Sequence, residues 1–204
     1  PKVRDFEEAG INVNKGFKDA YNKSNQELRQ AYNEVDAAQA KENPVFDLAS
    51  AKQRAKDLGI FGVAEEKEKI ASEIVDLQGK PITVAEVNRL VDVASPEGQV
   101  RRALALLDTL APEQMDYKVV QRLRSIVGGA IKTFKSGTGD NMTSGQARRV
   151  WDMFTDTLLN PVNKENTPEY LRTFEEATGK AREQFQWLRN AKVKGILNRE
   201  QQPY

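Results

Sequence analysis

The chain contains no histidine and no cysteine among its 204 residues. This double absence excludes disulfide bonds, thiolate nucleophiles, Ser-His or Cys-His relays, zinc fingers and nearly all transition-metal sites. The side chains that remain for catalysis are carboxylates, lysine, tyrosine, serine and threonine, which every globular protein carries. We therefore expect a protein that is not an enzyme and that needs no metal ion and no cofactor.

The chain also lacks an excess of charge of either sign, because 31 lysines and arginines stand against 30 aspartates and glutamates. Such a balance creates no global field that would attract nucleic acid or an anionic membrane. No apolar run approaches the roughly eighteen residues that a membrane span requires. Aromatic residues are scarce at 7% and charged residues make up 30%, which is typical of a soluble, helix-rich protein.

Apolar residues recur at steps of three and four along most of the chain, which predicts an all-α fold of about seven helices. The longest are expected at the two ends, over residues 12–40 and 167–197, each with one narrow apolar stripe. The first stripe is rich in tyrosine and alanine, which suits a thin seam against another helix better than a deep core. We therefore expect an elongated multi-helix assembly.

Capping signals place the shorter helices. Thr83-Val84-Ala85-Glu86 fits a capping box, Ser95-Pro96 opens the next helix, and Asp116 caps the one that follows. A short helix is expected to end at Leu58 before a left-handed Gly59, and another to cover residues 65–77. The leucines of residues 104–110 predict the centre of the core. We expect three parts: a long helix (1–42), short helices (43–80), and a bundle with the long C-terminal helix (81–204).

Residues 82–92 align without gaps on residues 142–152, sixty residues later. Both segments begin with a Thr-x-x-Glu/Gln box, and both carry Arg and then Asp at matching places. Two independently capped amphipathic helices explain this similarity, and a duplicated helical pair is the alternative. The loop at residues 136–141 is rich in glycine and precedes a helix, so it predicts a turn; phosphate binding is the less favoured alternative, because no Gly-Lys-Ser/Thr ending follows.

Two groups of side chains are candidates for contact with a partner. Basic residues on helices could meet nucleic-acid phosphates or mark solvated helix faces. They are Arg101, Arg102, Arg122, Arg124, Arg148, Arg149, Lys192 and Lys194. The aromatic candidates are Trp151, Phe185 and Trp187. The two tryptophans lie at positions that could meet in an antiparallel pair formed by the last two helices. Packing in a core or a seam is the favoured interpretation, and an exposed partner-binding anchor is the alternative.

Residues 81–95, 142–159 and 170–197 resemble a helical pattern of large bacteriophage virion polypeptides, particularly the internal or ejection proteins of short-tailed phages. The resemblance is carried by Pro-Ile-Thr-x-Ala-Glu-x-x-Arg, by Trp151-Asp152-x-Phe154 after a glycine-rich loop, and by Ala181-Arg182-Glu183 leading through Trp187 to a lysine-rich end. It implies a structural protein of the virion interior that is delivered with the genome and assembles as a tube or channel. It brings no catalytic residues.

We therefore expect a segment of a longer polypeptide that presents helical surfaces to copies of itself or to other virion proteins. A helical adaptor that binds nucleic acid, such as DNA, through its basic helix faces is the main alternative. An enzyme that uses carboxylates alone is a third, and it would require a deep pocket with two converging acids.

Overall fold

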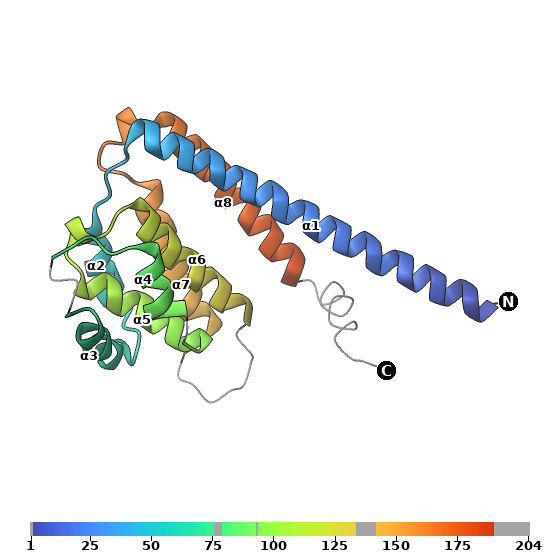
Figure 1. The fold of residues 1–204 in the computed structure, drawn as a ribbon, viewed down its shortest axis with the longest axis horizontal. Coiled ribbons are helices and arrows are strands. Elements are labelled where there is room, and N and C mark those ends of the chain that lie inside the picture. The colour runs from blue at the N-terminus through green and yellow to red at the C-terminus, as the bar shows by residue number, and fades with distance from the viewer. Residues whose placement is uncertain (1, 76–78, 93, 134–141, 190–204) are drawn as a thin grey trace. The chain divides into compact units, whose positions relative to one another are not determined.

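A computed structural model describes residues 2–75, 79–92, 94–133 and 142–189 (Figure 1). These residues form an all-α structure with no β-strand, which confirms the predicted fold class. The first and last helices are the longest, as the hydrophobic period predicts. The glycine-rich loop at 136–141 and the candidates Lys192 and Lys194 lie outside the described residues.

The chain divides into two compact units. The first, called here the hairpin unit, comprises residues 1–43 and 165–204, and the second, the bundle unit, comprises residues 44–164. The expected boundary after residue 42 is therefore close to an observed one. The expected boundary after residue 80 is wrong, because the short helices pack with the bundle that follows them. The C-terminal helix, which was assigned to that bundle, belongs instead with the N-terminal helix.

The hairpin unit consists of α1 (Lys2–Glu42) and α8 (Pro168–Arg189), which lie antiparallel along each other (Figure 1). On each of the two helices, one set of buried and half-buried positions follows alternating steps of four and three, the spacing of a coiled-coil seam. On α1 they are Phe17, Tyr21, Ser24, Leu28, Ala31, Val35, Ala38 and Glu42. On α8 this set is Tyr170, Phe174, Ala177, Ala181 and Gln184, and the buried Thr173 and Thr178 lie beside it.

Polar contacts fix the register of this seam at both ends. The Glu42 carboxylate accepts hydrogen bonds from the backbone amides of Glu169 (3.3 Å) and Tyr170 (2.8 Å), so α1 caps the first turn of α8. Fifteen or so residues away, the Gln184 amide donates to Asn25 Oδ1 at 2.7 Å. α1 begins at Lys2 and not near residue 12 as expected, since no proline interrupts its first turns and a glycine costs only about 1 kcal/mol.

The bundle unit contains six α-helices and one π-helical turn within the described residues. They are α2 (Leu48–Asp57), α3 (Val63–Glu73), α4 (Val84–Val87), the π-turn η2 (Asn88–Asp92), α5 (Pro96–Thr109), α6 (Tyr117–Thr133) and α7 (Ser144–Leu159). α5 packs against both α3 and α6, and α6 packs against α7. Leu104, Leu106, Leu107 and Leu110 of α5 and its C-cap are at most 2% exposed, which confirms the predicted core centre.

The predicted helix starts are confirmed where a local cap defines them. Thr83 with Glu86, and Thr143 with Gln146, form complete capping boxes. Ile82 and Met142, which precede the two threonines, are both buried, as a hydrophobic staple requires. The two similar segments then diverge, because the first continues as a π-turn and the second as a regular α-helix.

Asp47, Ser95 and Asp116 also cap their helices, and Gly59 adopts the expected left-handed conformation (φ 59°). α3 is less well predicted. It covers Val63–Glu73 and not residues 65–77, since its C-cap at Ile74 already leaves helical geometry.

The seam of the hairpin unit predicts a strong effect of truncation at Phe174, which is fully buried and stacks on Tyr170 with 5.7 Å between ring centroids. Phe174→Ala should lower the free energy of unfolding by about 3–5 kcal/mol, because truncation of this fully buried ring leaves a cavity in the seam. Urea unfolding gives the magnitude, and amide hydrogen exchange should accelerate in α1 and α8 and not in α5 or α6. The exposed neighbour Glu175→Ala is the matched control and should change stability by less than about 0.5 kcal/mol.

Candidate functional site

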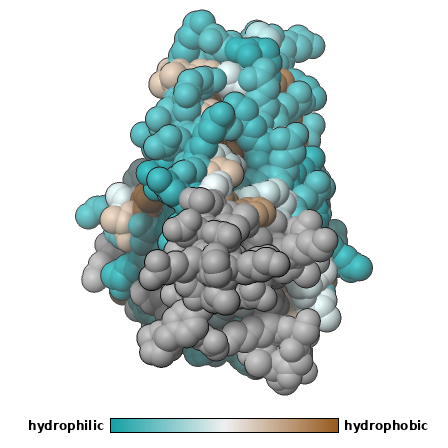
Figure 2. Space-filling view, turned by 90° about the vertical axis from the view of Figure 1, so that its right-hand side faces the viewer, coloured by the Kyte–Doolittle hydropathy of each residue, from teal (hydrophilic) through white to brown (hydrophobic). Residues whose placement is uncertain are grey.

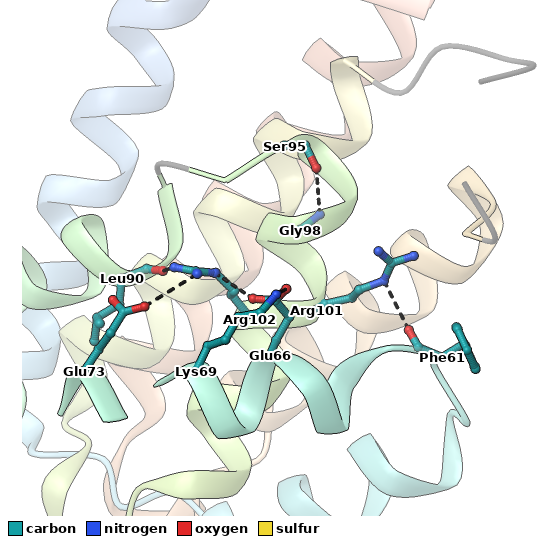
Figure 3. A network of polar contacts seen from close by, with 9 residues as sticks. All are labelled: Phe61, Glu66, Lys69, Glu73, Leu90, Ser95, Gly98, Arg101 and Arg102. Carbon is teal, nitrogen blue, oxygen red and sulfur yellow. Dashed lines mark hydrogen bonds and ion pairs between the residues drawn. The ribbon is translucent and has the colours of Figure 1, made fainter. Parts of the chain in front are cut away.

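The adjacent arginines of α5 bind to other parts of the bundle unit (Figure 3). Arg102 pairs through Nε with Glu66 at 2.8 Å and through a terminal nitrogen with Glu73 at 3.5 Å, and it donates to the Leu90 carbonyl at 2.7 Å. Its neighbour Arg101 donates from Nε to the Phe61 carbonyl at 3.1 Å. Arg102 therefore ties α3 and the π-turn to α5, which is a structural use of its charge.

Arg122 binds to the same π-turn. Its Nε donates to Asn88 Oδ1 at 2.5 Å, and a terminal nitrogen pairs with Asp92 Oδ2 at 2.7 Å. A π-turn leaves its carbonyls poorly matched to the helical ladder, so external donors stabilise it. The side chains of Arg102 and Arg122 therefore hold the π-turn from two helices, α5 and α6.

Arg124 lies in the interior and is 3% exposed. Its Nε donates to Thr155 Oγ1 at 2.8 Å, and its guanidinium lies 4.5 Å from the centre of the Trp151 ring. This is a cation–π arrangement that joins α6 to α7. The Trp151 ring also fills the space beside Gly128, where an added Cβ would approach the indole nitrogen to 3.0 Å. Trp151 therefore serves the packing of the bundle unit.

Of the basic candidates, Arg148 and Arg149 of α7 are exposed. Arg101, Arg102, Arg122 and Arg124 are half-buried or buried and hold helices and turns together. Four of the six described basic candidates therefore make contacts within the bundle unit, and two lie at its surface.

The two tryptophans pack in a seam and in an interior, as favoured from the sequence, but not through a pairing of the last two helices. Trp187 stacks on two rings of α1, with centroids 6.1 Å from Phe17 and 6.4 Å from Tyr21. Trp151 instead packs under Arg124 in the other unit. The reason is that α8 pairs with α1 and α7 pairs with α6, so the last two helices do not form the predicted antiparallel pair. Phe185 is half-buried on α8, beside the seam position Gln184.

An open groove of about 270 Å³ lies between α1 and α8 of the hairpin unit. Residues of both helices line it: Ala20, Ser24, Glu27, Lys180, Glu183, Gln184 and Trp187. Its apolar wall is the Trp187 ring with Ala20, and its polar rim carries two carboxylates and one ammonium group. The sequence period had placed these residues on helices, but it could not show that the two helices enclose a groove together.

The loop between α2 and α3 exposes a large aromatic side chain that the sequence analysis did not single out. Phe61 is 68% exposed. Gly59 and Gly62 on either side have φ angles of 59° and 79°, and the Phe61 carbonyl accepts the bond from Arg101. The pattern Gly-x-Phe-Gly could have signalled a displayed aromatic residue, since the glycines permit a tight loop that turns the side chain outward.

Acidic side chains of the bundle unit are neutralised by bases. Asp108 pairs with Lys56 at 3.3 Å and with Lys67 at 2.5 Å, while Lys52 donates to the Leu110 carbonyl at the end of α5. Burial raises the pKa of the Asp108 carboxyl, but the hydrogen bonds from the two lysines outweigh burial, so its pKa lies below the ordinary value. This carboxylate stays ionised, which suits a structural contact better than proton transfer.

Within the described ranges, no cluster of three or more acidic side chains could hold a metal ion. In the same part of the chain, none of the helices combines the length and the apolar character needed to cross a membrane. On the face shown in Figure 2, described residues are mostly hydrophilic, and hydrophobic ones form small separate areas.

No protein-family model matches the sequence, and neither a curated protein nor a solved structure shows significant similarity to it.

The ion pairs of Glu66 predict a pH-dependent contribution to stability. Burial raises the pKa of this carboxyl, but hydrogen bonds from Lys69 and Arg102 outweigh burial and bring its pKa below the ordinary value. Its stabilising contribution is therefore complete above the ordinary carboxyl pKa and is lost as pH falls through the lowered one. Glu66→Gln should cost about 1.5–3 kcal/mol at pH 7. Urea midpoints of the two proteins should converge below about pH 4, and a constant difference across this range would contradict the assignment.

Proposed function

We propose that the chain is a non-enzymatic structural segment of a bacteriophage internal virion protein, of the kind ejected with the genome. It works by presenting helical surfaces to copies of itself or to neighbouring virion proteins. The observation that carries this proposal is the long α1–α8 pair, whose seam keeps a seven-residue spacing over most of its described length. Paired helices of this kind are the element from which tubes and bundles are assembled.

The similarity of residues 81–95, 142–159 and 170–197 to ejection proteins of short-tailed phages supports the viral part of the proposal. The lowered pKa values of three carboxyl groups support the proposal that the chain is not an enzyme. Glu66, Asp108 and Glu169 each bind a lysine or an arginine, and the pKa of each carboxyl lies below its ordinary value. A general acid instead needs a raised pKa in a pocket that excludes water.

Mass spectrometry of purified phage particles tests the viral role. Peptides of this chain should be present in full particles of a phage that encodes it. They should fall to background in particles that have released their genome, whereas peptides of the major capsid protein should be retained. Absence of these peptides from full particles would refute the proposal, and their retention after genome release would refute delivery with the genome.

A salt titration of DNA binding separates this role from that of a nucleic-acid adaptor. Because four of the basic candidates bind within the bundle unit, we expect weak binding with a shallow dependence on salt. The double variant Arg148→Glu/Arg149→Glu, on the exposed face of α7, should change the affinity less than about tenfold. A steep loss of affinity with salt that this variant removes would favour the adaptor.

A further inference from the structure

We propose that Phe61 and Arg101 of one copy of the chain dock into the α1–α8 groove of a second copy. This inference rests on the proposed structural role and names the interface through which the copies would assemble. The two surfaces are a projecting aromatic side chain in the bundle unit and a groove of matching size in the hairpin unit.

The Phe61 ring is exposed on a loop whose conformation is fixed by a hydrogen bond. It is 68% exposed, and Figure 3 shows the Phe61 carbonyl directed toward Arg101 and the ring extending away from this hydrogen bond. Arg101 binds the Phe61 carbonyl at 3.1 Å, and an added Cβ at Gly62 would lie 3.1 Å from the same nitrogen. The loop is therefore fixed before any partner arrives, which reduces the entropy lost on binding. Buried aromatic anchors of this kind commonly dominate the binding energy of an interface.

Arg101 adds a charge beside the ring. Its Nε is used by the Phe61 carbonyl, and its terminal nitrogens make no ion pair with any carboxylate in the described part of the chain. Its neighbour Arg102, by contrast, is paired with Glu66 and Glu73. The surface around Phe61 thus combines an apolar ring with a guanidinium that can still accept an acidic partner.

The groove is large enough for the Phe61 ring and offers it an apolar wall. A cavity of about 150 Å³ already accommodates benzene, so a groove of about 270 Å³ has room for a phenyl ring. The Trp187 ring, stacked on Phe17 and Tyr21, offers an aromatic wall, and Ala20 adds a small apolar side chain to the lining. Aromatic pairs contribute beyond the area they bury.

The charges of the groove are complementary to Arg101. Glu27 and Glu183 line it together with Lys180, so the carboxylates outnumber the ammonium group. Glu183 has no ion-pair partner within the described residues, and Glu27 meets only Lys23, at 3.9 Å between two well-exposed side chains. A guanidinium entering the groove therefore gains carboxylate partners and displaces no strong pair.

Because the docking residue and the groove are different surfaces, the contact is head-to-tail. Such contacts form closed rings or open filaments, whereas a contact between two identical surfaces stops at a dimer. A ring or a filament is the geometry that a tube or channel requires.

Complementary variants test this arrangement by light scattering after size-exclusion chromatography. Phe61→Ser removes the docking ring, and Glu27→Lys/Glu183→Lys reverses the charge of the groove. Each variant alone should lose self-association by about 30-fold or more, the loss typical of a dominant interface residue. An equimolar mixture of the two should form 1:1 dimers and nothing larger, since each pair retains one intact docking residue and one intact groove. Val162→Ser, at a valine that is 70% exposed, is the matched control and should associate like the wild type.

Circular dichroism should show unchanged helix content in all variants, because the altered side chains are exposed or line an open groove. A mixture that remains monomeric would overturn the proposed contact, as would a wild type that remains monomeric at high concentration. A Phe61→Ser variant that associates as strongly as the wild type would also overturn it. The mass spectrometry of phage particles described above tests the viral role independently of this contact.

Discussion

The seam between α1 and α8 is the contact on which the organisation of the chain depends. It joins residues near the N-terminus to residues some 160 positions later, and it leaves residues 44–164 as a unit of their own. The seam is narrow, with alanine at several central positions and with Glu42 capping the first turn of α8 at its end. Closely packed small residues give the pair a defined register without requiring a wide core.

In the bundle unit, three arginines add polar contacts to the leucine-rich core. Arg102 and Arg122 hold the π-turn, and Arg124 joins α6 to α7 through Thr155 and Trp151. A planar guanidinium with several donors can satisfy carbonyls and carboxylates at once. These three arginines therefore use their charge for contacts inside the unit.

The sequence predicted those features that local chemistry determines. Both capping boxes, the proline-led start of α5, the left-handed Gly59 and the leucine-rich core follow from residues close together in the chain. The sequence did not predict which helices that lie far apart in the chain pack against each other. A heptad stripe shows that a helix pairs but not with which helix, so α8 was matched to α7 and not to α1. The display of Phe61 was missed for the same reason, since Arg101, which fixes its loop, lies 40 residues away. The similarity to phage ejection proteins stays a prediction.

The two ends of the bundle unit lie beside each other. The Val162 amide donates to the Val45 carbonyl at 2.6 Å, and the Val45 amide donates to Asn163 Oδ1 at 2.8 Å. Phe46 and Pro161 form an isolated bridge next to them. The chain therefore enters and leaves this unit at neighbouring points that are joined by hydrogen bonds. Domains whose ends lie close together are the ones that tolerate insertion into another protein. A different domain could therefore replace residues 44–164 in the course of evolution, while α1 and α8 kept the same pairing and register.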